Sequence, residues 1–302
     1  MRTGAMRIVA AAIFLLLAAW AVEGQDEQAG APPKVVNVLD KPSEPAYSAT
    51  LAFVPGSDVD RFGSISVFDF DSTWYWIAVK GVTPVDFDLK FHARDIMLVG
   101  TTDLDLPRQV AELAFDCAAT WRTGDMKLQA GVLPGLRSDL GGFDGDLLGV
   151  PVSAAIAYAF DPRIAGTVGF TYRQSFDRAI MPRIGVDWLA SDAVRVQAGL
   201  PRSEVTVTLD PVCTAHLGFA WENTTYDAQH KGNADRGNMT LEDFQLWAGL
   251  TYAMSEDVRF VVDVGQVFGR SVKFERSAVD GEADGISIDD NAFFRFGLVG
   301  AI

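Results

Sequence analysis

The chain has 302 residues, a formal net charge of −15 and a pI of about 4.5. This acidity argues against a nucleic-acid partner, which needs a basic surface, and against docking on anionic lipid through a polybasic patch. Hydrophobic residues make up 49% of the chain. With 20 Phe, 7 Trp and 28 Gly, the composition suits twisted strands and tight turns better than helices.

The first 24 residues have the organisation of a secretory signal peptide. Arg2 and Arg7 form a basic n-region, residues 8–20 are an unbroken apolar run, and Ala19-Trp20-Ala21 fits a cleavage site. An uncleaved membrane anchor is the alternative, but the run is short for a span of about 20 residues, and acidic sequence follows it. Residues 25–46 contain four prolines and are expected to form a periplasmic Pro-rich linker. A single domain then covers residues 47–302.

Hydrophobicity alternates with a period of two in that domain. Over residues 85–94, apolar Val, Phe, Leu, Phe and Ala alternate with Asp, Asp, Lys, His and Arg. Because successive side chains of a strand point to opposite faces, such a segment has one apolar and one polar face. The same alternation recurs in residues 113–122, 204–210, 213–222 and 258–265.

The spacing of turn residues predicts fourteen strands joined alternately by tight turns and mostly longer loops. The longest predicted loops cover residues 135–148, 227–239 and 275–290. Short turns at one end and long loops at the other are typical of bacterial outer-membrane barrels. We therefore predict an all-β fold, a single closed antiparallel transmembrane β-barrel of about 14 strands, or 12 if residues 193–210 form one kinked element. The predicted strands are 47–54, 62–80, 84–98, 108–123, 126–134, 149–160, 163–174, 180–190, 193–200, 203–210, 212–226, 240–254, 257–274 and 291–301.

Two further features favour a lipid-embedded barrel over a soluble β-sandwich. Large aromatic residues such as Trp74, Trp121 and Trp188 stand near strand ends, where aromatic girdles form at membrane interfaces. The last strand alternates up to the C-terminus and resembles the signal read by the barrel assembly machinery, although Ile302 stands where that signal usually has an aromatic residue. The expected partners are this machinery and outer-membrane lipid, and the expected location is the bacterial outer membrane. The oligomeric state is left open.

The middle of the chain resembles a known family. Residues 181–188 read MPRIGVDW and residues 191–201 read SDAVRVQAGLP. A P-x-x-G-x-x-W strand, a Ser-Asp turn and a G-L-P strand end recur in an uncharacterised family of predicted bacterial outer-membrane β-barrels. That family has no established activity, so the resemblance implies the fold and no mechanism.

If the apolar faces meet lipid, the polar faces line the lumen. Fourteen strands leave more interior than the eight that side chains alone can fill, so the leading hypothesis is a passive channel or transport pore for small solutes, tuned by lumenal charges. A non-conducting structural or surface-interaction barrel, closed by paired charges, is the alternative. The pore-lining candidates are Asp86, Asp88, Lys90, His92, Arg94, Asp116, Arg122, Asp187, Arg195, Glu204, His216, Glu222, Arg259, Asp263 and Arg295.

A lipid-modifying enzyme is a third hypothesis. Such chemistry needs a nucleophile beside a His and a carboxylate. His92 lies near Asp88, but no G-x-S-x-G elbow is present, and the chain is predicted not to be an enzyme. No catalytic, cofactor or metal site is predicted, since the acidic loops lack the EF-hand pattern. The two cysteines, Cys117 and Cys213, are expected to be buried free thiols, with one disulfide as the alternative.

Overall fold

Every regular element in the described part of the chain is a β-strand. The computed structural model describes residues 47–59, 63–79, 85–102, 106–139, 148–174, 176, 178–229, 236–275 and 286–300. The predicted signal peptide and linker therefore lie outside the described residues. Within the described ranges, no helix is long and apolar enough to cross a membrane.

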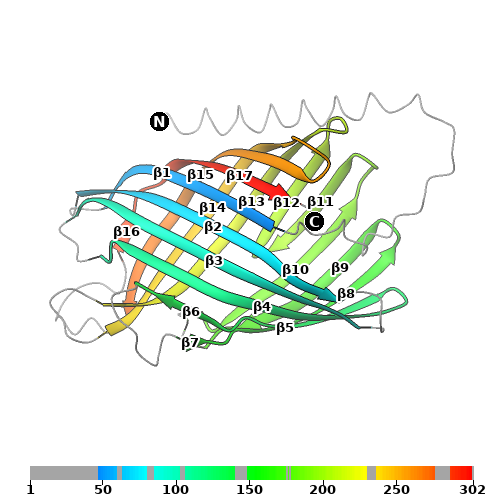
Figure 1. The fold of residues 1–302 in the computed structure, drawn as a ribbon, viewed down its shortest axis with the longest axis horizontal. Helices are drawn as coiled ribbons and strands as arrows, with labels where there is room; N and C mark the ends of the chain where they lie inside the picture. Colours follow the sequence, from blue (N-terminus) through cyan, green and yellow to red (C-terminus); the bar gives the residue numbers. More distant parts are fainter. Residues whose placement is uncertain are drawn as a thin grey trace.

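The strands form a closed antiparallel ring (Figure 1). Positions that follow one another around the ring pair antiparallel, and β17 closes the ring by pairing with β1 over Phe53↔Phe294 to Tyr47↔Gly300. Three positions in the ring are split into two strands each: β5 with β6, β7 with β8, and β16 with β17. The strands are β1 (Tyr47–Asp58), β2 (Gly63–Val79), β3 (Val85–Thr102), β4 (Gln109–Thr123), β5 (Met126–Val132), β6 (Gly135–Ser138), β7 (Leu148–Gly149), β8 (Val152–Asp161), β9 (Ile164–Tyr172), β10 (Ile180–Leu189), β11 (Val194–Leu200), β12 (Arg202–Thr208), β13 (Cys213–Gln229), β14 (Arg236–Ala253), β15 (Val258–Glu275), β16 (Ile286–Ile288) and β17 (Asn291–Gly300).

The prediction of an all-β, closed, 14-stranded barrel is confirmed. The alternative of 12 strands is wrong, because β11 and β12 are separate strands that pair with each other over Val194↔Val207 to Gln197↔Glu204. They look like one kinked element in the sequence because only Pro201 separates them.

The outer face of the barrel is apolar. Large outward side chains such as Phe87, Val168 and Ile184 are more than half exposed, at 53%, 59% and 56%. A continuous apolar surface of this kind is unstable in water and is stable against acyl chains. The alternation therefore has its apolar side outward, which is the arrangement of a membrane-spanning barrel.

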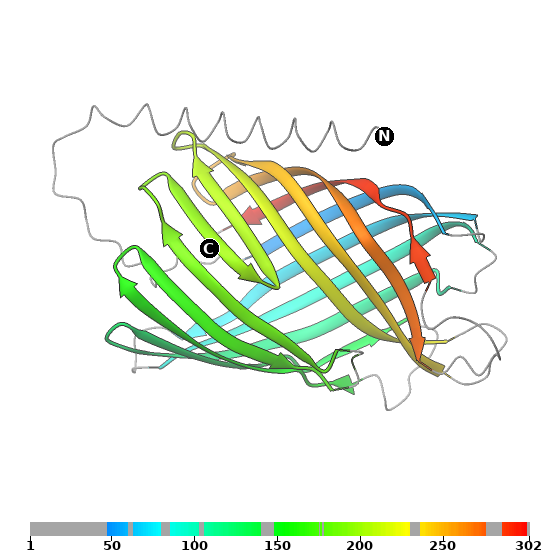
Figure 2. The same cartoon turned by 180° about the vertical axis from the view of Figure 1, so that it is seen from behind.

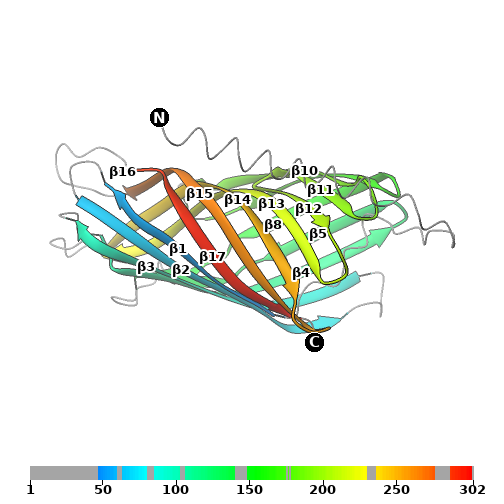
Figure 3. The ribbon, with the colours of Figure 1, turned by 90° about the horizontal axis from the view of Figure 1, so that it is seen from above.

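Two aromatic belts border this apolar band. Tyr47 stacks on Trp74 near the terminal end of the barrel, with ring centroids 5.8 Å apart. Toward the long-loop end, Phe244 stacks on Phe219 at 6.2 Å, on Trp221 at 6.1 Å and on Phe268 at 5.7 Å. On β14 the band runs from Tyr252 to Phe244, which is roughly 27 Å along the strand and about 21 Å along the membrane normal at the usual tilt. This span matches the apolar belt of an outer-membrane barrel, and the strand tilt is plain in Figure 3.

Beyond the aromatic belt around Phe244, at the long-loop end, the barrel narrows, because only some of its strands continue (Figure 2). β13 extends to Gln229, whereas β11 ends at Leu200 and β12 begins at Arg202. There β6 and β13, which run in the same direction, meet in a parallel bridge between Ser138 and Asp227. The main-chain N–H of Asp139 also donates to the carbonyl of Asp227 at 3.1 Å. We call this part the narrow ring; it consists of β1, β2, β3, β4, β6, β13, β14, β15 and β16 with the start of β17.

The interior of the narrow ring is a packed apolar core. Inward side chains from its strands are buried against one another, and Val110, Tyr226, Met239 and Val272 are fully enclosed, each with 0% exposure. A 14-stranded ring is too wide for side chains to fill, but a ring of about nine strands is close to the size at which they can. The narrowing therefore creates a closed outer end.

A bulge at Gly269 sets which residues of β15 face this core. Gly269 has a φ of +59°, which glycine adopts without the penalty that a Cβ brings. The bulge changes the inward positions of β15 from odd numbers, as at Asp263, to even numbers, as at Arg270. Simple alternation along the sequence cannot show this change.

Several boundaries differ from the predictions. The expected loop 135–148 contains β6 and the first residue of β7, the expected loop 227–239 contains the end of β13 and the start of β14, and the expected loop 275–290 contains β16. The end of β13 and the start of β14 read as a loop because the side chains on the face opposite to Tyr226 and Met239 are polar, as at Asp227 and Asn238, which strands tolerate once they leave the lipid. Cys117 and Cys213 are free, as expected, but they are half-buried, and the prediction of buried thiols was wrong.

Candidate functional site

A cavity of about 860 Å³ runs along the barrel interior. Its lining extends from Ser48 and Val299, near the terminal end, to Leu106 and Ile288, near the long-loop end. The lining has two parts, which we call the charged zone and the apolar zone. The charged zone comprises Asp69, Asp71, His92, Arg94, Glu112, Arg202, Glu204, His216, Glu222, Asp243, Asp263, Arg270 and Arg295. The apolar zone comprises Val54, Ile65, Val67, Ile96, Leu98, Leu106, Leu241, Val272 and Ile288.

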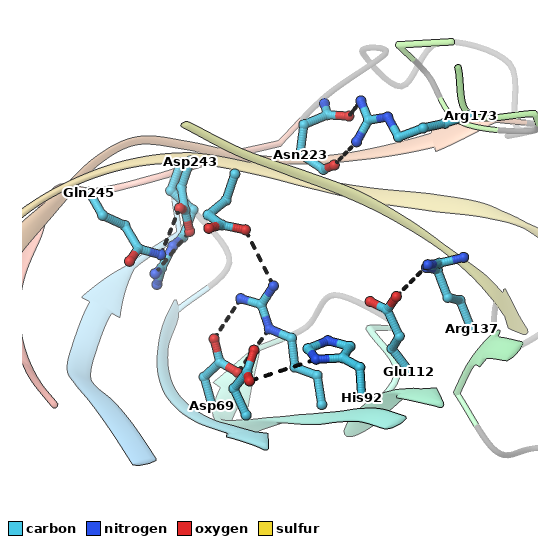
Figure 4. A network of polar contacts seen from close by, with 12 residues as sticks. Asp69, His92, Glu112, Arg137, Arg173, Asn223, Asp243 and Gln245 are labelled. Carbon is cyan, nitrogen blue, oxygen red and sulfur yellow. Dashed lines mark hydrogen bonds and ion pairs between the residues drawn. The ribbon is translucent and has the colours of Figure 1, made fainter. Parts of the chain in front are cut away.

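Arg94 bridges the lumen at the centre of the charged zone, where it pairs with Asp69 and Glu222; Figure 4 shows Asp69 and His92 of this zone. Its guanidinium donates to both carboxylate oxygens of Asp69, at 3.0 and 2.6 Å, as a bidentate pair. It also donates to Glu222 on the opposite wall at 3.4 Å. Beside it, His92 Nδ1 lies 3.3 Å from Thr73 Oγ1 and 3.8 Å from Asp71 Oδ1. The pairing of Asp71 with Arg94 in the β2–β3 register brings these groups together.

Two further ion pairs surround Arg94. Arg270 donates to Asp243 at 3.3 Å, and Gln245 donates to the other oxygen of this carboxylate at 3.2 Å. Arg137 of β6 pairs with Glu112 of β4, and both side chains are buried. Since an uncompensated charge in this interior would be costly, pairing of opposite charges is the expected arrangement.

Asp263 holds a separate network nearer the terminal end. Its two oxygens contact His216 Nε2 and Arg295 Nε, each at 2.6 Å. The space for the carboxylate exists because residue 249 is a glycine; a Cβ there would lie 1.9 Å from Asp263 Oδ1. The Arg295 guanidinium also lies 4.7 Å from the ring centroid of Trp247, a cation–π contact.

The loop between β9 and β10 packs against the outside of the narrow ring. Arg173 donates to the main-chain carbonyl of Asn223 at 2.5 Å and to its side-chain oxygen at 3.0 Å. Arg178 donates to Glu242 at 3.0 Å, and its guanidinium lies 5.1 Å from the ring centroid of Trp221. These contacts tie the short strands of the membrane-embedded wall to the longer strands beside them.

The structure brings together seven of the fifteen predicted pore-lining residues. His92, Arg94, Glu204, His216, Glu222, Asp263 and Arg295 line the cavity. The other eight lie on the same face of their strands but outside this cavity: Asp86, Asp88, Lys90, Asp116, Arg122, Asp187, Arg195 and Arg259. Among them Arg195 donates to Asp187 at 2.9 and 2.5 Å. That these side chains line a conducting path stays a prediction.

Several charged residues of the cavity were not among the predicted pore-lining residues. Asp69 and Asp71 alternate with Phe68 and Phe70, so the same period of two could have found them. Glu112 precedes the segment in which the alternation of β4 was recognised. Arg270 could not be assigned a face from its sequence position, because the Gly269 bulge changes the periodicity.

The histidines do not form a catalytic relay within the described residues. A relay needs the nucleophile and the carboxylate on different ring nitrogens, but Thr73 and Asp71 both approach Nδ1 of His92. The hydrogen-bond partner of His216 among the described residues is the carboxylate of Asp263. In the same part of the chain, no group of three or more His, Cys, Asp or Glu residues is placed to hold a metal ion.

Comparison with known proteins identifies a family. The family model described as "Domain of unknown function (DUF6268)" matches residues 123–298. No curated protein matches the chain. Among solved structures, LpxR from Salmonella typhimurium is 8% identical with a TM-score of 0.40, over 85% of this chain and 100% of that one. A KdgM porin is 8% identical with a TM-score of 0.31, over 84% and 99%. Pseudomonas aeruginosa OpdL is 10% identical with a TM-score of 0.32, over 85% and 98%. Similarity this low carries no functional argument.

Proposed function

The chain belongs to the DUF6268 family of domains of unknown function, and on the geometry of its interior we propose that it is a bacterial outer-membrane barrel that passes small solutes through a gated lumen. The observation that carries this proposal is the cavity of about 860 Å³, whose lining reaches from the terminal end to the long-loop end. A barrel stabilised only by a packed interior has no need of such a cavity, whereas a solute path requires one.

The apolar zone is the proposed gate. Its side chains are almost completely buried from water, with Ile65 at 3%, Ile96 at 6% and Leu98 at 9% exposure. Narrow apolar constrictions block ions because water leaves them, and they open when the constriction widens or becomes polar. In this proposal the structure is the closed state, in which solutes reach the charged zone but not the outside.

Polar substitution in the gate tests this proposal. Leu98→Ser makes the constriction easier to wet, while Val99→Ser on the outward face of the same strand, where Val99 is 53% exposed, is the matched control. In planar bilayers we expect brief, rare openings of the wild type, more frequent openings of Leu98→Ser, and no change with Val99→Ser. Heat-modifiable migration on a gel verifies that each variant is folded. If folded wild type and Leu98→Ser both show no conductance steps at any voltage, the proposal fails.

A non-conducting structural or surface-interaction barrel is the second candidate. The observation in its favour is the closed outer end, where Tyr226, Met239 and Val272 are fully buried and Arg94 bridges to Glu222 across the lumen. This candidate predicts that the Leu98→Ser variant shows no conductance in bilayers and that cells lacking the protein have unchanged permeability to dyes.

A further inference from the structure

We infer that the lumen selects cations, and that the selecting layer consists of Asp69, Asp71 and Glu222 around Arg94. This inference rests on the proposed function and specifies the class of solute. The charged zone contains seven carboxylates and four guanidinium groups. The location of the excess negative charge follows from how these groups pair.

Outside this layer, every cavity carboxylate has an arginine of its own. Each of the four pairs has an N···O distance below 3.5 Å and is locally neutral: Asp263–Arg295, Asp243–Arg270, Glu204–Arg202 and Glu112–Arg137. A passing ion therefore meets little net charge at these positions, because the field of a close pair falls off quickly.

Inside the layer, three carboxylates share one arginine. Asp69 and Glu222 both pair with Arg94, and the ionic partner of Asp71 is His92, at 3.8 Å. The histidine adds a positive charge only when it is protonated. The layer therefore has a net charge of about −2 with a neutral His92, and this is where the negative excess of the cavity lies.

Two of the three carboxylates of the layer are also much more accessible than its arginine. The side chains of Asp71 and Glu222 are 38% and 40% exposed, whereas that of Arg94 is 15% exposed. A solute in the cavity thus reaches carboxylate oxygens more readily than guanidinium nitrogens. Accessible carboxylates of this kind form the selective rings of cation channels.

Tyr226 supplies a second, independent observation. It lies on the same face of β13 as Glu222 and lines the cavity, with 0% exposure. Its buried hydroxyl has no hydrogen-bond partner among the described residues. Buried polar atoms are almost always satisfied, so an orphaned hydroxyl at a cavity wall indicates a missing partner. A cation with its water shell, or an ammonium group, can supply that partner by donating to the phenolic oxygen.

The reversal potential in a KCl gradient across a planar bilayer tests the inference. A unit charge about 5 Å away in water changes the local concentration of a monovalent cation about fourfold. We expect the wild type to favour K⁺ over Cl⁻, and Asp71→Asn and Glu222→Gln each to lower the permeability ratio about fourfold. Asp187→Asn is the matched control, since it removes the same charge from the inner face outside the cavity, and it is expected to change the ratio by less than twofold.

The outcomes separate this inference from the proposed function. A conducting wild type that prefers Cl⁻, or whose permeability ratio is unchanged in both Asp71→Asn and Glu222→Gln, overturns the inference and leaves the pore intact. A folded barrel without conductance overturns the proposed function and this inference together. The two variants change different strands, so a folding failure of one leaves the other to decide.

Discussion

Replacing Asp263 by asparagine removes one negative charge from the interior while preserving the shape of the side chain. Asp263 is 1% exposed and accepts hydrogen bonds of 2.6 Å from both His216 and Arg295. An asparagine offers a single carbonyl oxygen and no charge. Asp263→Asn therefore leaves the Arg295 guanidinium without its counter-charge.

The cost follows from the burial of the pair. Breaking a buried ion pair by removing one partner costs about 3–5 kcal/mol. The Arg295 side chain is 18% exposed, and water in the cavity can hydrate it in part. We therefore expect the lower end, about 3 kcal/mol, which lowers the ratio of folded to unfolded protein roughly 100-fold.

Urea unfolding in liposomes, followed by tryptophan fluorescence, measures this loss. Asp187→Asn is the control: its carboxylate bonds Arg195 at similar distances but is 22% exposed, and we expect a loss of about 1 kcal/mol. Equal losses for Asp263→Asn and Asp187→Asn, or a loss below about 1 kcal/mol for Asp263→Asn, would refute the reasoning that burial makes the Asp263 network costly to break.

Three further predictions concern the bulge at Gly269, the contact of Arg178 in the β9–β10 loop, and the outward face of the barrel at Cys117. Gly269→Ala places a Cβ at a φ of +59° and 3.2 Å from the Phe244 ring; we expect a loss of about 1–3 kcal/mol in the same urea titration, and an unchanged midpoint would contradict the bulge. Arg178→Ala removes the ion pair with Glu242; we expect faster cleavage of the β9–β10 loop by added protease with a stability change below about 1 kcal/mol, and an unchanged cleavage rate would count against the packing of this loop. Cys117 lies on the outward face beside Val132; in liposomes it should react with a lipid-soluble maleimide and resist a charged one, and reaction with both would show that this face meets water.

The barrel could be predicted from the sequence because its main signal is local. Alternation over residues 85–94 requires only the two-residue period of a strand, and it appears in the structure as β3 with Phe87 outward and His92 inward. The family resemblance in residues 181–201 fell on β10 and β11, which pair as expected for a hairpin.

The narrow ring could not be predicted, because it depends on relations between distant strands. Ser138 and Asp227 meet only because five intervening strand positions end earlier. Segments that build this ring are polar on the face away from its core, as at Asn223, Thr225 and Asp227, and polar sequence between strands normally indicates a loop. The closed outer end was missed for the same reason.

The candidate site was predicted in part. Composition and alternation located His92, Arg94 and Glu222 on a polar face, but they could not show that Arg94 reaches Glu222 across the lumen. That contact joins β3 to β13 and depends on the diameter of the ring. The position of Arg270 depends in turn on the bulge at Gly269.

A cysteine scan along β14 tests the central claim, that this strand crosses lipid between Tyr252 and Phe244 and lies outside the lipid between Asp243 and Asn238. Single cysteines at positions 238–252, in a background that lacks the two native ones, are spin-labelled in liposomes and their collision rates with oxygen and with a water-soluble nickel complex are measured. We expect oxygen accessibility to alternate with a period of two from Tyr252 to Phe244, with Leu246 and Leu250 high and Trp247 low, and the alternation to disappear from Asp243 to Asn238. Alternation that continues to Asn238, or nickel accessibility at Leu246 and Leu250, would contradict the placement of the barrel in the membrane.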